Sequence, residues 1–232
     1  MNIWDATREA FALLFSGDAE LWRTIFISLR VSLTALLIAT PFAILLGYAL
    51  ATFRFPTRRA LVVVLQSMLS FPTVVVGLIL YLLLTRRGPL GDFHLLFTQD
   101  SMIIGQAIIA FPVLAAFTLA AVQSADGRVR ETALSLGASN GRAALTTLRE
   151  VRFGVMAGVF NGFGRVISEV GCSMMVGGNI ADVTRNIPTA IALETSKGEF
   201  AQGIALGVVL IGVALGVNIA LSVVQGSGGL KS

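Results

Sequence analysis

The stretch VSLTALLIATPFAILLGYALATF, residues 31–53, contains no charged side chain and decides the fold. A helix needs about 20 apolar residues to cross the hydrocarbon core of a bilayer, which is about 30 Å thick. The stretch therefore predicts a transmembrane helix over about 29–51. Arg30, at its beginning, can extend its long side chain toward the membrane surface.

The composition of the whole chain agrees with this reading. Of its 232 residues, 55% are hydrophobic and 13% are charged, and the mean hydropathy is +0.84, whereas a soluble domain carries about 25% charged residues. Charge-poor runs predict four further spans, at about 61–84, 101–122, 153–176 and 203–224. We therefore expect an all-α integral membrane protein with five transmembrane helices between residues 22 and 224. This length leaves no room for a fused ATPase domain.

Several other classes of function are disfavoured. The single cysteine, Cys172, has no partner for an internal disulfide, and with only one histidine, His94, a metal or redox site is not expected. The spans contain one carboxylate, Glu169, which argues against an enzyme embedded in the membrane. The net charge of +4 is accounted for by the loops, so no nucleic-acid partner is expected, and neither is a cofactor in this chain.

The ends of the chain and the loops predict an orientation. Residues 1–21 mix aromatic and charged side chains and are expected to lie at the outer membrane interface, with Asp18 capping the helix that follows. Residues 225–232 are rich in glycine and predict a flexible tail. Arginines concentrate in 54–59 and 123–152, which are therefore predicted to be cytoplasmic. With five spans, the N-terminus is outside and the C-terminus is cytoplasmic.

The loop at 123–152 has the pattern of two short amphipathic helices. They would join at Gly137, a residue that readily adopts a left-handed turn. Such a pair of helices would form a rigid projection from the membrane. An ordinary solvated connection between two spans is an equally good interpretation of the composition.

Glycines recur in the last two spans at helical spacing. Small residues four apart let another helix approach closely in lipid, and they are present at Gly154, Gly158, Gly162, Gly207, Gly212 and Gly216. Packing within one bundle explains part of this pattern. Five spans hardly enclose a path for a hydrated solute, so we also expect a homodimer with the path at its two-fold axis.

Polar and helix-breaking residues inside the spans are candidates for a path or gate. Arg165 and Glu169 lie four apart, on one face of the predicted fourth span, where they can pair. Arg165 could provide positive potential near an anion path, or the two could form a structural ion pair. Pro72 and Pro112 would interrupt backbone hydrogen bonds in the second and third spans, as gate elements or static kinks. Less specific candidates for path residues are Asn161, Ser168 and Ser173.

The pattern Glu131-x-Ala133-x3-Gly137 resembles the coupling motif of permease subunits of bacterial ABC importers. In that family the two short helices dock into a groove on a separate cytoplasmic ATPase. The resemblance implies this role for Glu131 and Ala133 on the first helix, Gly137 at the turn, and Arg142 and Leu145 on the second. The Leu-Pro that ends the family motif is absent, since Leu148 is followed by Arg149 and Glu150.

Residues 168–180 and 184–200 closely resemble permeases of the molybdate and tungstate group, most of all its tungstate branch. The resemblance implies a permease of the type I ABC importer fold in the bacterial inner membrane. ATP and Mg²⁺ would bind the partner ATPase subunits, and an extracytoplasmic protein would deliver the oxyanion. Tungstate is the expected solute, with molybdate or sulfate as alternatives. An ion-coupled secondary carrier is a further alternative, which inverted repeats would favour.

Overall fold

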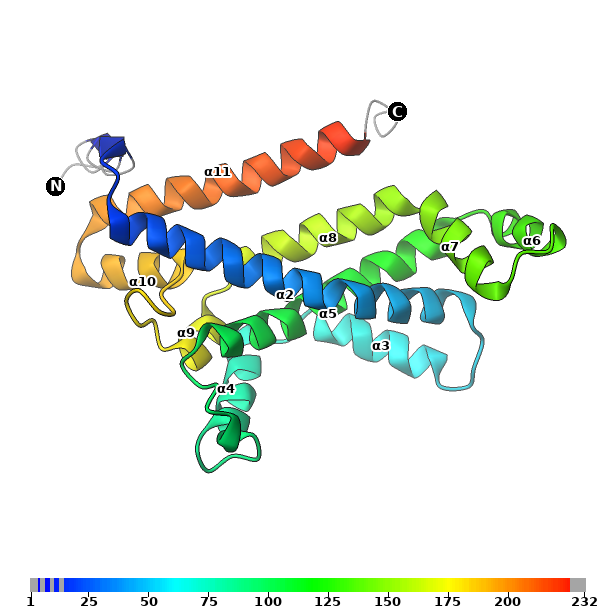
Figure 1. Ribbon diagram of the computed structural model, residues 1–232, viewed down its shortest axis with the longest axis horizontal. Coiled ribbons are helices and arrows are strands. Elements are labelled where there is room, and N and C mark those ends of the chain that lie inside the picture. The colour runs from blue at the N-terminus through cyan, green and yellow to red at the C-terminus, as the bar shows by residue number, and fades with distance from the viewer. Residues whose placement is uncertain (1–3, 5–6, 9–10, 13–14, 226–232) are drawn as a thin grey trace.

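The computed structural model of the chain describes residues 4, 7–8, 11–12 and 15–225. Its longest helices, α2 (Ala19–Thr52) and α5 (Gln99–Ser124), pack side by side along most of the molecule (Figure 1). Asp18 caps α2 as predicted, because its Oδ1 accepts a hydrogen bond from the backbone N–H of Leu21 at 2.8 Å. Parts of the predicted interfacial segment, at 1–3, 5–6, 9–10 and 13–14, and most of the predicted tail, at 226–232, lie outside the described residues.

Small residues on one face of α2 explain the close packing of this pair. Ala35 and Ala43 are fully buried, and a Cβ added at Gly47 would lie 2.6 Å from the carbonyl oxygen of Ala115 on α5. One buried polar contact joins the same helices, in which the Ser32 hydroxyl donates to Oε1 of Gln106 at 3.0 Å. The first and third predicted spans are thus continuous helices that form the centre of the bundle.

The predicted span at 61–84 is not one helix. It consists of α3 (Arg58–Met68) and α4 (Thr73–Leu84), which meet at an angle of 99°. Pro72, immediately before α4, has no N–H to continue a helix across the break. α3 lies along the bundle, whereas α4 projects from it and leads into the short 3-10 helix η1 (Gly91–Phe93) (Figure 1).

The loop after α5 contains two helices, α6 (Gly127–Ser135) and α7 (Asn140–Glu150). The predicted span at 153–176 that follows is also interrupted. It consists of α8 (Arg152–Ile167) and α9 (Gly171–Gly177), with three residues between them outside either helix. α8 packs on α5, and α9 packs mainly on α4.

The chain ends with α10 (Ile187–Lys197) and α11 (Phe200–Gln225). A capping box begins α10, in which Asn186 Oδ1 accepts from the Thr189 N–H and Thr189 Oγ1 accepts from the Asn186 N–H. A small apolar core fixes these helices to the start of α2; its buried members are Leu21, Ile25, Ile187, Ala190, Ala205 and Leu206. From there α11 runs along one side of the bundle (Figure 1).

The described residues form an all-helical membrane protein. Three helices are long and apolar enough to cross a bilayer, namely α2, α5 and α11 over 200–217, and a fourth span results if α3 and α4 count as one. Large apolar side chains are exposed along them, including Leu37 and Ile211, as expected where lipid is the solvent. α8 has 16 residues and α9 has 7, so neither is long enough by itself to cross a bilayer. The five-span count therefore stays a prediction.

Candidate functional site

The α6–α7 hairpin lies at one end of the molecule, opposite α10 (Figure 1). Gly137 stands at its turn with a φ of +86°, a conformation that L side chains rarely adopt. Two backbone hydrogen bonds close the turn, from the Gly137 N–H to Leu134 O and from the Ala138 N–H to Ala133 O, both at 3.0 Å. This is the geometry by which helices commonly end at glycine.

Side chains also fix where the two hairpin helices begin. Asp126 accepts from the Arg128 N–H at 3.0 Å, and the Ser139 hydroxyl accepts from the Arg142 N–H at 3.4 Å. The sequence-based prediction missed both caps, although an Asp or Ser just before a helical pattern is a usable signal. The hairpin is therefore held as a defined shape.

The hairpin exposes the residues that the coupling motif contains. Glu131, Gly137, Arg142 and Leu145 are exposed, and Ala133 is half-buried. Leu136, at the turn, is 83% exposed, although the segment around it is polar. Leu145, on α7, is a second large apolar side chain that the hairpin leaves exposed, at 49%.

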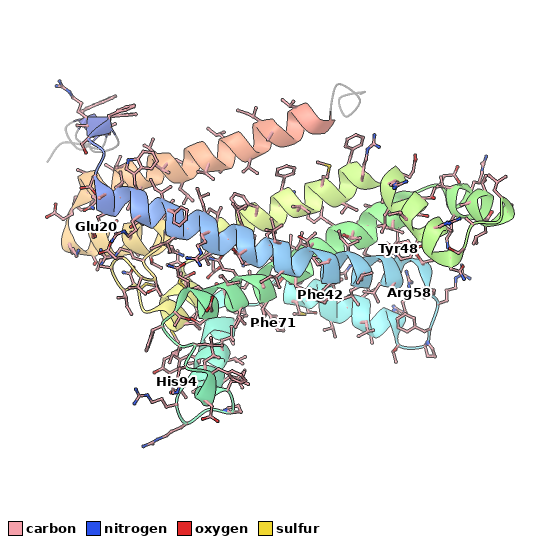
Figure 2. All side chains as sticks on the ribbon, viewed as in Figure 1. Glu20, Phe42, Tyr48, Arg58, Phe71 and His94 are labelled. Carbon is pink, nitrogen blue, oxygen red and sulfur yellow. The ribbon has the colours of Figure 1, made fainter. Side chains whose placement is uncertain are left out.

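A second candidate site lies where the bend between α3 and α4 faces α5. A cavity of about 230 Å³ is present there, with Phe71 and Thr73 from the bend, Pro112 from α5 and Arg165 from α8 among its lining residues. Figure 2 shows Phe71 beside α5, close to the base of the α4 projection. The lining is otherwise apolar, so Arg165 provides its only formal charge.

The predicted pairing of Arg165 with Glu169 is wrong. α8 ends at Ile167, so the two residues do not share a helix face. Glu169 is buried and its Oε1 accepts from the Cys172 N–H at 3.0 Å, which caps α9. In the part of the chain that the structure describes, the exposed Arg165 guanidinium has no hydrogen bond or ion pair.

The remaining polar candidates behave differently from one another. The Asn161 amide donates to Ala157 O, and the Ser168 hydroxyl donates to Gly164 O, so both exposed side chains bond to their own helix. Ser173, on α9, is buried, and within the described chain its hydroxyl has no hydrogen-bond partner. Pro112 is buried inside an uninterrupted α5, whereas Pro72 lies at the break.

The glycine-rich faces of α8 and α11 also differ. A Cβ at Gly154 or Gly158 would lie 2.7 or 2.6 Å from Cβ of Ala121 or Phe117, and one at Gly162 would lie 3.3 Å from Leu114, all on α5. At Gly207, Gly212 and Gly216 a Cβ would meet nothing within 4 Å in the described chain.

No group of three or more His, Cys, Asp or Glu residues suited to a metal ion occurs among the residues with described positions. The cavity at the α3–α4 bend combines one cation, Arg165, with a mostly apolar lining. Sequence reasoning missed the cavity because it depends on the angle between α3 and α4. It also missed Gly77, Gly105 and Gly171, where helices approach closely.

Comparison with known proteins gives consistent matches over most of the chain. Residues 24–226 match the family model described as "Binding-protein-dependent transport system inner membrane component". The tungstate uptake system permease protein TupB of Campylobacter jejuni is 41% identical over 93% of this chain and 90% of its own length. The molybdenum transport system permease protein ModB of Escherichia coli K12 is 30% identical over 77% of this chain and 82% of its own.

A solved structure supports the fold. A bacterial ABC transporter involved in the import of the acidic polysaccharide alginate has a chain that superposes with a TM-score of 0.71, covering 91% of this chain and 82% of that one. The sequences are 19% identical, so the likeness concerns the fold alone.

Proposed function

We propose that this chain, which belongs to the family of binding-protein-dependent transport system inner membrane components, is the permease of an ATP-driven importer of tungstate. It is a multi-pass protein of the inner membrane and is itself not catalytic. The observation that carries the solute assignment is the 41% identity to a tungstate uptake permease across nearly the whole of both chains.

The permease works with other subunits. Membership of the family implies an ATPase and a binding protein. ATP and Mg²⁺ bind the ATPase, which supplies the energy, and the external binding protein supplies the affinity for the oxyanion. Two copies of this chain form the membrane part, with the path between them, because one copy has too few helices to enclose a hydrated anion.

The α6–α7 hairpin is the contact with the ATPase. Its support is the exposed apolar tip at Leu136, the fixed turn at Gly137 and the exposed Glu131, Arg142 and Leu145. A rigid, capped hairpin transmits a movement of the ATPase to the spans on either side of it, α5 and α8. Exposed Leu136 and Leu145 would be covered on docking.

This assignment orients the chain in the membrane. The hairpin end is cytoplasmic and carries the basic loop that contains Arg58, whereas Glu20 lies at the opposite, outer end (Figure 2). Basic residues in short cytoplasmic loops agree with the positive-inside rule. The N-terminus is then outside and the C-terminus is cytoplasmic. With the α3–α4 and α8–α9 segments each counted as one crossing, the chain has five.

Arg165 is the path residue that attracts the oxyanion. Its guanidinium is exposed beside the cavity at the α3–α4 bend and has no partner among the described residues. An unpaired cation within a membrane segment is costly, and such charges usually face water or a partner. A divalent oxyanion that passes the cavity would provide that partner transiently, so the site can be weak while the binding protein holds the affinity.

Transport by the reconstituted complex tests the proposal. The chain is placed in proteoliposomes with its ATPase and binding protein, and uptake of tungstate, molybdate and sulfate is measured with and without internal ATP. We expect ATP-dependent tungstate uptake, reduced in Arg165→Gln and retained in the matched control Arg152→Gln, which removes an exposed arginine at the start of the same helix. Uptake that persists without the ATPase would instead indicate an ion-coupled carrier.

Molybdate is the second candidate solute. The 30% identity to a molybdenum transport permease favours it over unrelated anions. Tungstate and molybdate are tetrahedral dianions of nearly the same size, so discrimination resides in the binding protein rather than in this chain. ATP-dependent uptake of molybdate but not tungstate in the same vesicles would replace the first assignment with the second.

A further inference from the structure

A groove lies where α2, α7 and α8 meet, at the hairpin end of the molecule. Its volume is about 280 Å³, and two arginines line it, Arg149 near the end of α7 and Arg152 at the start of α8. It is separate from the cavity at the α3–α4 bend, because Arg152 lies about 20 Å along α8 from Arg165, at about 1.5 Å per residue. The rest of the lining is apolar and comes from all three helices, namely Ile44, Leu145, Leu148, Val155 and Met156.

The predicted spans place this groove at the boundary between water and lipid. The first span is expected to end near residue 51 and the fourth to begin near residue 153, so Arg149 lies at the level of the lipid head groups. Ile44 lies about 10 Å before the end of the first span, and Met156 lies one helical turn into the fourth. The charged part of the groove therefore faces head groups, and its apolar part faces acyl chains.

Arg149 is the available cation of the groove. It is exposed and, among the described residues, has no ion pair or side-chain hydrogen bond. The adjacent Glu150 lines a different groove, together with Asp126. The guanidinium of Arg152 lies over the ring of Phe153, 4.8 Å from its centroid. The groove thus carries two positive charges and, in the part of its lining that the structure describes, no acidic side chain.

This lining fits a molecule that carries a negative charge beside an apolar chain. The guanidinium of arginine matches phosphate oxygens well, through two parallel hydrogen bonds. A free oxyanion would use Arg149 but would gain nothing from Val155 or Met156, whereas an acyl chain would cover both. A zwitterionic head group would bring its own ammonium close to the two arginines, which is unfavourable. Basic pockets between membrane helices are known to bind anionic head groups.

We propose that the groove between α2, α7 and α8 binds one anionic phospholipid from the leaflet on the hairpin side. Arg149 binds its phosphate, whereas Arg152 adds to the positive potential without a direct contact. One acyl chain lies along Ile44, Val155 and Met156. In this position the lipid anchors the base of the α6–α7 hairpin to the membrane surface. The inference goes beyond the proposed function, because it involves neither the solute nor its path.

The partner ATPase is the competing occupant of the groove. Leu145 belongs both to this lining and to the proposed contact with the ATPase. An ATPase would reach the groove from the water, whereas a lipid enters it from the bilayer. The two occupants are therefore distinguished by measuring lipid binding with and without the ATPase.

Photocrosslinking in nanodiscs tests the site. The full chain, alone or in complex with its ATPase, is placed in phosphatidylcholine nanodiscs with a trace of phosphatidylglycerol that carries a diazirine near the head-group end of one acyl chain. Crosslinked peptides are identified by mass spectrometry. We expect crosslinks on the peptide that contains Val155 and Met156, with equal yield in both samples. Excess unlabelled phosphatidylglycerol should abolish them, whereas tungstate or inorganic phosphate at the same concentration should not.

Arg149→Gln tests the phosphate contact. We expect the crosslinking yield at Val155 and Met156 to fall roughly fivefold or more, as for the loss of one arginine beside an anionic head group. The matched control is Arg54→Gln, which removes an exposed arginine that does not line the groove. Arg54 belongs to the basic loop that contains Arg58, at the same end of the molecule (Figure 2). This control should keep the yield of the unmodified chain.

Four outcomes would overturn the lipid site. Equal losses in Arg149→Gln and Arg54→Gln would mean that overall charge attracts the lipid. Equal crosslinking by a diazirine-labelled phosphatidylcholine would remove the requirement for an anionic head group. Competition by inorganic phosphate would indicate a site for free oxyanions, and loss of the crosslink on addition of the ATPase would assign the groove to that subunit. Competition on the unmodified chain decides even if a variant fails to fold. Tungstate uptake is not part of the measurement, so failure here is distinct from failure of the proposed function.

Discussion

The glycine-rich faces of α8 and α11 are alike in sequence and differ in their surroundings. On α8, Gly154 and Gly158 lie so close to α5 that a Cβ would collide with Ala121 or Phe117. On α11, Gly212 and Gly216 face open space in the described chain. A glycine repeat therefore shows that a close approach is possible, and only the tertiary structure shows whether the same subunit provides the neighbour.

The difference suggests what α11 packs against. The α8 face has a neighbour within the subunit, whereas large apolar side chains beside the α11 glycines, Ile211 and Leu215, are 62% and 58% exposed. Lipid alone does not require glycine at such positions. In the proposed dimer, we therefore expect the glycine face of α11 to pack closely against a helix of the second copy.

We expect the largest effect from adding a side chain at a glycine of α8 that packs directly on α5. In Gly158→Val the new Cβ would lie 2.6 Å from Cβ of Phe117, a contact that forces α8 and α5 apart. Overpacking of this kind costs roughly 1–3 kcal/mol or more. We expect loss of monodisperse protein in detergent, measured by size-exclusion chromatography, and a lower melting temperature. Gly164→Ala, on the same helix with no neighbour within 4 Å, is the control.

The equivalent change on α11 should affect assembly and not the subunit. A Cβ at Gly212 would meet nothing within 4 Å in the described chain, so the subunit is expected to fold with Gly212→Leu, while close packing with a second copy is lost. Native mass spectrometry in detergent should show a shift from dimer to monomer at unchanged yield. If Gly212→Leu destroys the subunit as Gly158→Val does, the contrast between the two faces is wrong.

A third glycine, Gly137, tests the effect of backbone conformation at a place where an added Cβ has open space. A Cβ at Gly137 would meet nothing within 4 Å, but its φ is +86°, so Gly137→Val strains the backbone without a collision of the new Cβ. The cost of such a conformation is about 1–3 kcal/mol, confined to the α6–α7 hairpin. We expect the protein to fold and ATP hydrolysis to become uncoupled from uptake in proteoliposomes. Undiminished uptake in this variant would count against the coupling role.

Continuous apolar length made most of the fold predictable. The predicted spans at 29–51 and 101–122 have few alternatives to a long helix, and both lie within single helices, α2 and α5. The breaks inside the predicted spans were less predictable, because a proline by itself does not determine whether a helix is interrupted. Pro41 and Pro112 lie inside continuous helices, whereas Pro72 marks a 99° bend. Neighbouring helices decide which of these outcomes occurs.

The candidate site was predictable only in part. The hairpin around Gly137 follows from local signals, namely polar composition and a glycine at a turn, and the two helices are present on either side of it. The role of Glu169 was not accessible in this way. Pairing at a spacing of four assumes one helix through both residues, but the helix ends at Ile167 because the chain turns there to pack on α4.

The smallest effect is expected from Gly216→Ala on α11. It is also the most discriminating, because the change is stabilising or destabilising according to whether another helix packs on this face. Replacing a helical glycine by alanine in open surroundings stabilises the helix by roughly 0.5–1 kcal/mol. Gly216→Ala would have this effect on α11 of an isolated subunit, where a Cβ meets nothing within 4 Å. In a dimer packed through this face, the same methyl group separates the helices and weakens association. The melting temperature should therefore be measured below and above the protein concentration at which the dimer dissociates. Relative to the unmodified chain, we expect Gly216→Ala to raise it for the dilute monomer and to lower it for the concentrated dimer. A rise at both concentrations would mean that the α11 glycines face lipid.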